Sequence, residues 1–484
     1  MKQLRIALIC ILTALLCATV LPARAETAQA EDLTGRMTFD FGVYGKAQKN
    51  VLERSVSRQT FKVNASFSMT WDEPLSNARL CVQWFDLPEN VSVLQYDAAG
   101  ALLSEQTLPQ LPETITPLLP DARKAVVQAG NAGMTVWFLG VYGAGELPDP
   151  FHDFLETPDH LDYLLISTHP DDDVLYLGSV VPVYGAERGY TGTVVYVTTP
   201  NRERVTEAEN GAWAMGVRYR PVFLGMNDVS DAARKKKGSL FRYEDVLLNI
   251  VRIYRRLHPV VVFAQDFKGE YGHWQHELTT KAAQEAFSLA ADPTYDPESA
   301  EQYGTWQVQK LFIHLYKKNT IVIDAHEPLS FFDGKDAFEV ARAAYKKHAS
   351  QQKYKFKVER DTGRFPFNCF GMAEGVVEVG EDVFDNIDET LLSDYVPPTP
   401  EPTAEPTPEP TPEPTEAPTP EPTAAPTVAE ETPEPSPTGI PVQKPSDPPP
   451  DSVHRNYTLP IVLGALGAAA IAALVVLLAK RKRG

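Results

Sequence analysis

The feature that most constrains the fold is an alternation of apolar runs and helix-forming segments between residues 160 and 266. The apolar runs cover residues 162–168, 191–199, 220–226 and 259–266, and the clearest amphipathic helix between them covers residues 243–257. Strands that are apolar along their whole length and are joined by helices form sheets covered on both faces. The sequence therefore predicts a Rossmann-like α/β fold, with a mostly parallel sheet and helices on both faces.

A different texture precedes this region. Short runs rich in β-branched and aromatic residues, separated by turn signals, cover residues 60–71, 78–85, 91–97 and 134–142. This spacing predicts an antiparallel β-sandwich, placed at residues 26–150. The stretch LCVQWFDLPENVSVLQYDAAG, residues 80–100, is similar to the strands of discoidin-type (F5/8) sugar-binding modules. The resemblance implies a carbohydrate-binding module, and a support domain without its own ligand is the alternative.

The two ends of the chain predict targeting segments. Residues 1–25 combine a basic start, an apolar core and a small-residue cleavage site, as secretory signals do. Residues 459–479 form an apolar run long enough to span a bilayer, and the basic residues 480–484 behind it indicate the cytoplasmic side. We therefore expect a single-pass protein of the cell membrane whose folded domains are extracellular.

Residues 396–458 repeat proline, threonine and glutamate. Such a tract cannot bury a core and adopts an extended conformation, so we expect a disordered stalk. It resembles the stalks of Gram-positive bacterial surface proteins, which favours a bacterial surface location. The net charge of −19 argues against a nucleic-acid partner. Outside the predicted signal the chain has Cys81 and Cys369, and the sequence leaves open whether they pair.

Two polar clusters follow the first and fourth apolar runs. The first holds His169, Asp171, Asp172 and Asp173, and the second holds His273 and His276. Since ligands of parallel sheets bind beyond the carboxyl ends of the strands, the clusters are expected to converge. Two imidazoles and one carboxylate suit a divalent metal, which would also neutralise the stacked acids.

The spacing also suggests a division of labour. His169 and Asp172, three residues apart in a tight turn, can share one face, and Asp171 then points toward the attacking water. A zinc ion would activate that water, and a nearby carboxylate would take its proton. The set of two histidines and one carboxylate also occurs in non-haem iron oxygenases, which is an alternative of another class.

The two motifs resemble those of a known family. THPDDD (residues 168–173) followed by GHWQH (residues 272–276) is similar to the GlcNAc-PI de-N-acetylase family (PIG-L, LmbE-like). The resemblance implies a deacetylase domain at residues 155–395 that uses Zn²⁺ to remove the acetyl group from N-acetylglucosamine-type sugars. The roles it implies are metal binding by His169, Asp172 and His276, general base catalysis by Asp171, and oxyanion stabilisation or amine protonation by His273.

The resemblance extends to other positions. Arg204 and Glu207 in RVTE match the family's Arg-x-x-Glu, Asp228 matches an acid that touches sugar hydroxyls, and residues 346–351 match a late His-x-Ser-Gln segment. Trp274 could stack on a sugar face or pack under the loop. Where this chain has Asp173, the family usually has glutamate, so Asp173 either orients a supporting partner or weakens the site.

These observations predict an enzyme that deacetylates amino sugars of an extracellular glycan or glycolipid, anchored to the membrane by its C-terminal helix. The alternative from another class is a non-catalytic glycan-binding surface protein with a degenerate site. The complete set of polar residues favours the enzyme, and the departure at Asp173 favours the binding protein.

Overall fold

The computed structural model describes residues 28–42, 51–53, 59–62 and 64–393. The predicted signal, stalk, membrane helix and basic tail lie outside these ranges. In the described part of the chain, no helix has the length and apolar character needed to cross a membrane.

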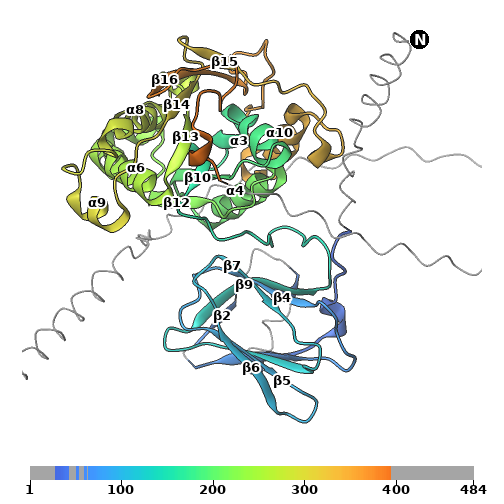
Figure 1. The fold of residues 1–484 in the computed structure, drawn as a ribbon. Coiled ribbons are helices and arrows are strands. Elements are labelled where there is room, and N and C mark those ends of the chain that lie inside the picture. Colours follow the sequence, from blue (N-terminus) through green and yellow to red (C-terminus); the bar gives the residue numbers. More distant parts are fainter. Residues whose placement is uncertain (1–27, 43–50, 54–58, 63, 394–484) are drawn as a thin grey trace, which may run out of the picture. The chain divides into compact units, whose positions relative to one another are not determined.

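Two antiparallel sheets of five and four strands form the N-terminal part, in the orders β1-β3-β8-β5-β6 and β2-β9-β4-β7 (Figure 1). The strands are β1 (Thr38–Asp40), β2 (Gln59–Phe61), β3 (Ser66–Thr70), β4 (Arg79–Trp84), β5 (Ser92–Tyr96), β6 (Leu102–Thr107), β7 (Glu113–Pro117), β8 (Lys124–Gln128) and β9 (Met134–Tyr142). Phe67 from one sheet and Trp84 and Val136 from the other belong to one hydrophobic core. The predicted antiparallel sheets are therefore confirmed.

The second part is built on a seven-stranded sheet in the order β12-β11-β10-β13-β14-β16-β15. Its strands are β10 (Leu161–Ser167), β11 (Gly192–Thr198), β12 (Val222–Met226), β13 (Pro259–Ala264), β14 (Lys310–His314), β15 (Thr320–Val322) and β16 (Cys369–Gly375). Strands β10 to β14 run parallel, whereas β16 is antiparallel to β14 and β15. The prediction of a mostly parallel sheet is confirmed.

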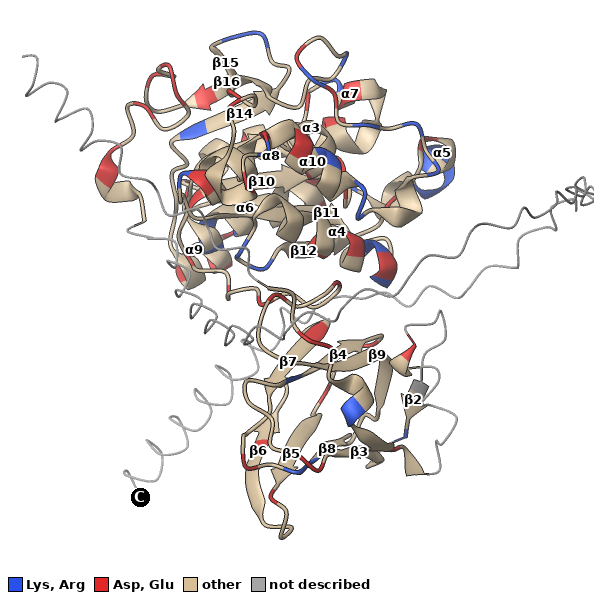
Figure 2. Cartoon of the chain, turned by 90° about the vertical axis from the view of Figure 1, so that its right-hand side faces the viewer, with Lys and Arg blue, Asp and Glu red and all other residues tan. Residues whose placement is uncertain are grey.

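Helices cover both faces of this sheet, as Figures 1 and 2 show. The α-helices are α3 (Asp172–Tyr176), α4 (Arg202–Met215), α5 (Arg234–Lys237), α6 (Tyr243–Leu257), α7 (Gly269–Gly272), α8 (Trp274–Leu289), α9 (Pro297–Tyr303) and α10 (Ala337–Tyr345), and a π-helical segment covers Val181–Glu187. Alternate residues of β10 enter opposite cores: Leu165 packs in the core that includes α4 and α10, and Leu164 in the core that includes α6 and α8.

The topology brings the two polar clusters together. Strand β10 pairs in parallel with β13, so the carboxyl ends of both strands lie at the same edge of the sheet. The turn after β10 leads into α3, and the segment after β13 leads into α7 and α8.

Cys81 and Cys369, whose pairing the sequence left open, are both free: Cys81 is buried in β4 and Cys369 begins β16. The boundary predicted between residues 150 and 155 remains a prediction.

A buried arginine fixes the loop after α8. Arg255 is fully buried on α6, and its guanidinium donates to the carbonyl oxygens of Leu289, Ala290, Asp292 and Asp296 and to the Ser299 hydroxyl. We expect Arg255→Lys to lower the free energy of unfolding by about 2–4 kcal/mol, because lysine cannot form this fork and leaves buried carbonyls without donors. Urea denaturation measures the change. Arg256→Lys at the exposed neighbour should change it by less than about 0.5 kcal/mol, and equal effects of the two substitutions would contradict the role of Arg255.

A buried carboxyl group makes stability depend on pH. Burial and the neighbouring carboxylate of Glu113 raise the pKa of Glu209 from its ordinary 4.5 to about 8, although Arg220 lies 3.0 Å away. The folded state therefore holds this proton more tightly than the unfolded chain. Its contribution to stability is full below pH 4.5 and is lost as the pH rises toward 8. Urea midpoints at several pH values should show wild type losing stability relative to Glu209→Gln across this window, and a constant difference would refute the assignment.

Candidate active site at the carboxyl edge of the sheet

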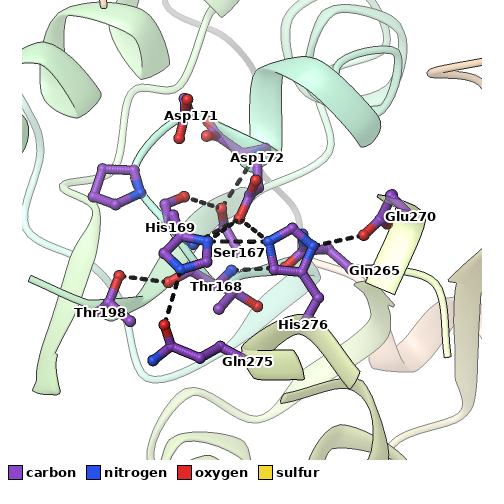
Figure 3. Close-up of polar contacts among 12 residues, drawn as sticks. Ser167, Thr168, His169, Asp171, Asp172, Thr198, Gln265, Glu270, Gln275 and His276 are labelled. Carbon is purple, nitrogen blue, oxygen red and sulfur yellow. Dashed lines mark hydrogen bonds and ion pairs between the residues drawn. The ribbon is translucent and has the colours of Figure 1, made fainter. Parts of the chain in front are cut away.

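Three side chains from the two clusters meet at one point. The Nδ1 atom of His169 lies 3.0 Å from the Nε2 atom of His276, and the Asp172 Oδ2 atom lies 3.0 Å and 3.1 Å from these two nitrogens (Figure 3). Ligand atoms about 2.0–2.2 Å from a tetrahedral zinc ion lie about 3.3–3.5 Å from one another. The triangle therefore needs only small adjustments to share one divalent cation.

Local hydrogen bonds hold the turn that carries two of these groups. The backbone N–H of His169 donates to Asp172 Oδ2 at 2.7 Å, which folds the turn so that both side chains face the same way. The Ser167 hydroxyl donates to the His169 carbonyl and accepts from the Asp173 N–H. Thr168 N–H donates to Gln265 Oε1, which ties this turn to the end of β13. As the spacing predicts, the side chains of His169 and Asp172 lie on the same face of the turn.

Glu270 lies behind His276 and was not predicted from the sequence. Its Oε2 atom lies 2.7 Å from His276 Nδ1, and its Oε1 atom lies 3.1 Å from His314 Nδ1 and accepts from the Asp266 N–H at 2.8 Å. The Gln265 side-chain nitrogen also lies 2.8 Å from His276 Nδ1. The Glu270 backbone has φ 52° and ψ −78°, a conformation that non-glycine residues rarely adopt. This geometry aims the imidazole of His276 at the triangle.

His169 is oriented by different groups. Its Nε2 atom lies 3.3 Å from Gln275 Oε1, which also accepts from the Val229 N–H, and 3.7 Å from the Asp228 carboxylate. The Asp228 side chain is 42% exposed, so it lies at the rim where a ligand can reach it. The Nε2 atom of His169 thus faces the amide of Gln275, whereas the Nδ1 atom of His276 faces the buried carboxylate of Glu270.

The electrostatics of the triangle suit a cation. Burial alone would lower the pKa of His276, but the carboxylates of Asp172 and Glu270 outweigh it and raise the pKa to about 10. Burial alone would raise the pKa of Asp172, but His276 and His169 hold it well below its ordinary value. The cluster therefore favours positive charge at its centre, which a divalent ion supplies.

Asp171 faces away from the triangle. Its Oδ1 atom accepts from the Arg204 guanidinium at 2.7 Å, and the same Nη2 atom donates to the Pro170 carbonyl at 2.9 Å. Burial raises the pKa of Asp171 despite the nearby Arg204. A carboxylate with a raised pKa accepts a proton more readily. Arg204 is buried, and its guanidinium holds Asp171. It therefore positions Asp171 and presents little exposed surface to a substrate.

His273 lies beside the triangle. Its ring centroid is 4.7 Å from that of His169 and 4.8 Å from that of His276. Burial and the two neighbouring histidines lower the pKa of His273 to about 4, so the ring is neutral at pH 7. Its Nδ1 atom is buried and has no partner among the described residues. Ligand atoms of His169, His273 and His276 lie within 4.8 Å of one another, but Asp172 closes a tighter triangle than His273.

Two predicted residues lie elsewhere. Trp274 is 3% exposed, and its indole N–H donates to the Val229 carbonyl, so its ring packs under the loop and the predicted stacking on a sugar is not supported. Asp173 is fully buried and accepts from the Tyr196 hydroxyl at 2.9 Å, away from the triangle. Burial raises the pKa of Asp173 to about 8. It therefore supports β11 rather than a histidine of the cluster.

The late segment at residues 346–351 lies against α4. Both oxygens of Glu207 accept from Ser350, one from its N–H and one from its hydroxyl at 2.7 Å. His348 is fully buried, and a Cβ atom at Gly211 would lie 2.5 Å from its Nε2 atom, so glycine makes room for this ring. The RVTE and HASQ stretches therefore form one contact.

Comparisons with known proteins agree with the two motifs. Residues 164–287 match the family described as GlcNAc-PI de-N-acetylase (PIG-L). The 1D-myo-inositol 2-acetamido-2-deoxy-alpha-D-glucopyranoside deacetylase 1 of Catenulispora acidiphila is 27% identical over 177 residues, covering 31% of this chain and 54% of the relative. The deacetylase of the same description from Streptomyces scabiei is 27% identical over 218 residues, covering 39% and 64%. The chain thus spans between half and two thirds of the length of these relatives.

Solved structures show more distant similarity. The N,N'-diacetylchitobiose deacetylase from Pyrococcus horikoshii is 19% identical, with 40% of this chain and 70% of that chain covered and a TM-score of 0.31. An F5/8 type C domain from Bacteroides fragilis is 8% identical, with 25% and 99% covered and a TM-score of 0.20. With both motifs inside the matched range, residues 164–287 belong to the GlcNAc-PI de-N-acetylase (PIG-L) family.

Proposed function

We propose that this chain is a metal-dependent hydrolase that removes the N-acetyl group from N-acetylglucosamine-type sugars of an extracellular glycan or glycolipid. The observation that carries the proposal is the triangle of His169, Asp172 and His276, whose ligand atoms lie 3.0–3.1 Å apart. The relatives support it, because their descriptions state that they deacetylate 2-acetamido-2-deoxy sugars.

The residues take distinct roles in this reaction. His169, Asp172 and His276 would hold a cation, with zinc as the expected ion, which would polarise the acetyl carbonyl and acidify water. Asp171, held by Arg204, accepts the proton of the attacking water and passes it to the departing amine nitrogen. His273 is neutral and donates a hydrogen bond to the oxyanion that forms on the carbonyl oxygen. Asp228, at the rim, accepts hydrogen bonds from sugar hydroxyls.

The location of the enzyme is part of the proposal. A cleaved signal, a proline-rich stalk and a C-terminal membrane helix would place the folded domains outside a bacterial cell, within reach of surface glycans. The β-sandwich would bind the same glycan and raise its effective concentration near the site.

Metal analysis combined with amine release tests the proposal. The purified full chain should bind about one zinc per molecule and release primary amine from chitin oligosaccharides. His276→Ala should lose both properties, whereas His326→Ala, at an exposed histidine paired with Asp361, should keep both. Failure of the wild-type chain to bind zinc would refute the proposal. Zinc and glycan binding without amine release from any N-acetylated sugar would support the alternative, a glycan-binding protein with a degenerate site.

A further inference from the structure

Two exposed basic segments flank the candidate site. The first is α5, Arg234–Lys237, and the second is the stretch Lys353–Lys357. We call their basic side chains the basic rim: Arg234, Lys235, Lys236, Lys237, Lys353, Lys355 and Lys357. Figure 2 shows α5 as a basic element, coloured blue.

Side-chain contacts join both segments to the site. The Arg234 guanidinium lies 4.9 Å from the ring of Trp274, the residue between His273 and Gln275. The Phe356 ring lies 5.2 Å from that of Tyr271, and the Tyr271 ring lies 5.5 Å from that of His276. The first segment therefore contacts the residue that follows His273, and the second segment is joined to His276 through Phe356 and Tyr271.

The charge of the rim contrasts with that of the chain. The chain carries a net charge of −19, yet neither segment of the rim contains an acidic residue. Other surface arginines, such as Arg188 and Arg360, pair with aspartates. Among the residues that the structure describes, no ion pair within 4.0 Å involves a rim side chain. Asp228 and Asp231 precede α5 in the sequence, and these two acids do not balance the seven basic side chains of the rim. Unpaired like charges kept together favour a polyanionic partner.

Exposed aromatic rings lie within the same surface. Tyr271, Tyr354 and Phe356 are 39%, 51% and 39% exposed, and Phe356 contacts both tyrosines. Large apolar side chains exposed in one patch mark interaction sites. Rings of this kind offer flat apolar faces with a polar edge, which suit the faces of sugar rings. Lysine and aromatic residues alternate from Lys353 to Lys357. This segment can therefore offer both cationic groups and aromatic faces to a single glycan chain.

We propose that the basic rim binds carboxylate or phosphate groups of an anionic glycan, so that the substrate is an N-acetylated amino-sugar polymer charged along its chain. This inference rests on the proposed function, because it assigns the polymer whose acetylated sugar enters the site. The exposed rings of Tyr271, Tyr354 and Phe356 suit bases as well as sugars. The choice of a glycan rests on the adjoining site, which is proposed to deacetylate amino sugars, and on the net charge of −19, which disfavours nucleic acids and anionic lipid surfaces.

Binding and amine release by the full chain test the inference. The probes are hyaluronan oligosaccharides, which carry carboxylates, an N-acetylglucosamine-substituted poly(glycerol phosphate), which carries phosphates, and neutral chitin oligosaccharides of equal length. At low ionic strength, at least one anionic probe should bind about tenfold or more tightly than the neutral one, and this advantage should disappear as salt is raised. The two anionic probes distinguish carboxylate from phosphate.

Charge reversal locates the effect. K236E/K355E, with one substitution in each segment, should lose the preference for the anionic probe and keep amine release from chitin oligosaccharides. R256E/K335E makes the same change of charge at exposed residues outside the rim and should behave as wild type. Arg256 precedes β13, whose opposite end leads to the site.

The outcomes separate the two proposals. Equal binding of anionic and neutral probes, or equal behaviour of the two double variants, would overturn the role of the rim. Tighter binding of single-stranded DNA or of anionic vesicles than of every glycan would overturn it as well, because the rim would then serve another partner. Absence of amine release from all probes would refute the proposed deacetylase, while the binding preference would still report on the rim.

Discussion

Asp171→Asn should reduce amine release by about 10²–10⁴-fold and leave the zinc content of the protein unchanged. The amide cannot accept the proton of the attacking water, and Asp171 lies outside the triangle that would hold the cation. Burial raises the pKa of Asp171, which makes its carboxylate a better proton acceptor than an exposed aspartate. Initial rates of amine release, measured with metal analysis of the same samples, give both quantities.

Asp173→Asn is the matched control. Asp173 is fully buried and its pKa is raised to about 8, so the group is already largely neutral at pH 7, and asparagine replaces it with little change of charge. Its contact is with Tyr196 rather than with the cluster. We expect a rate within a few-fold of wild type. If Asp173→Asn were as inactive as Asp171→Asn, the assignment of the base to Asp171 would be wrong.

Glu270→Gln should weaken zinc binding by about 10–100-fold, the range found when a residue that orients a metal-binding histidine is changed. The carboxylate of Glu270 lies 2.7 Å from His276 Nδ1 and is completely buried, so its charge increases the basicity of that imidazole. Glutamine keeps the shape and a hydrogen bond but loses the charge. Competition with a fluorescent chelator measures the affinity without relying on activity.

Glu270→Gly and Glu270→Ala separate the side chain from the backbone. Glycine adopts φ 52° and ψ −78° with less strain than alanine, so the glycine variant should have the higher melting temperature. Both variants lack the carboxylate and should bind zinc with equal, reduced affinity. Wild-type affinity in Glu270→Gln would show that the Glu270 charge does not act on the cation site.

The sequence was most informative where local pattern and chemistry coincide. Apolar runs alternating with helices predict a parallel sheet, and parallel pairing of β10 with β13 then brings His169, Asp172 and His276 to one edge. The spacing of three between His169 and Asp172 is enough to place both in one turn. The second inference needs only local contacts, and the first needs only the general rule that the strands of a parallel sheet end at the same edge.

The remaining features depend on tertiary contacts that no local pattern encodes. Arg255 stands in a run that reads as the polar end of an amphipathic helix, yet it is fully buried because five oxygen atoms of another loop surround it. Trp274 had two open interpretations, and the packing of Phe241 and Arg234 around it decides for burial. Glu270 lies two residues before the GHWQH motif, and its role requires a backbone conformation that no local pattern predicts.

Anomalous diffraction from crystals of the full chain soaked with zinc tests the central claim most directly. We expect one strong zinc peak about 2.0–2.2 Å from His169 Nδ1, His276 Nε2 and a carboxylate oxygen of Asp172. A zinc peak bound by other residues, or no peak near these three atoms at saturating zinc, would contradict the proposed metal-dependent deacetylase.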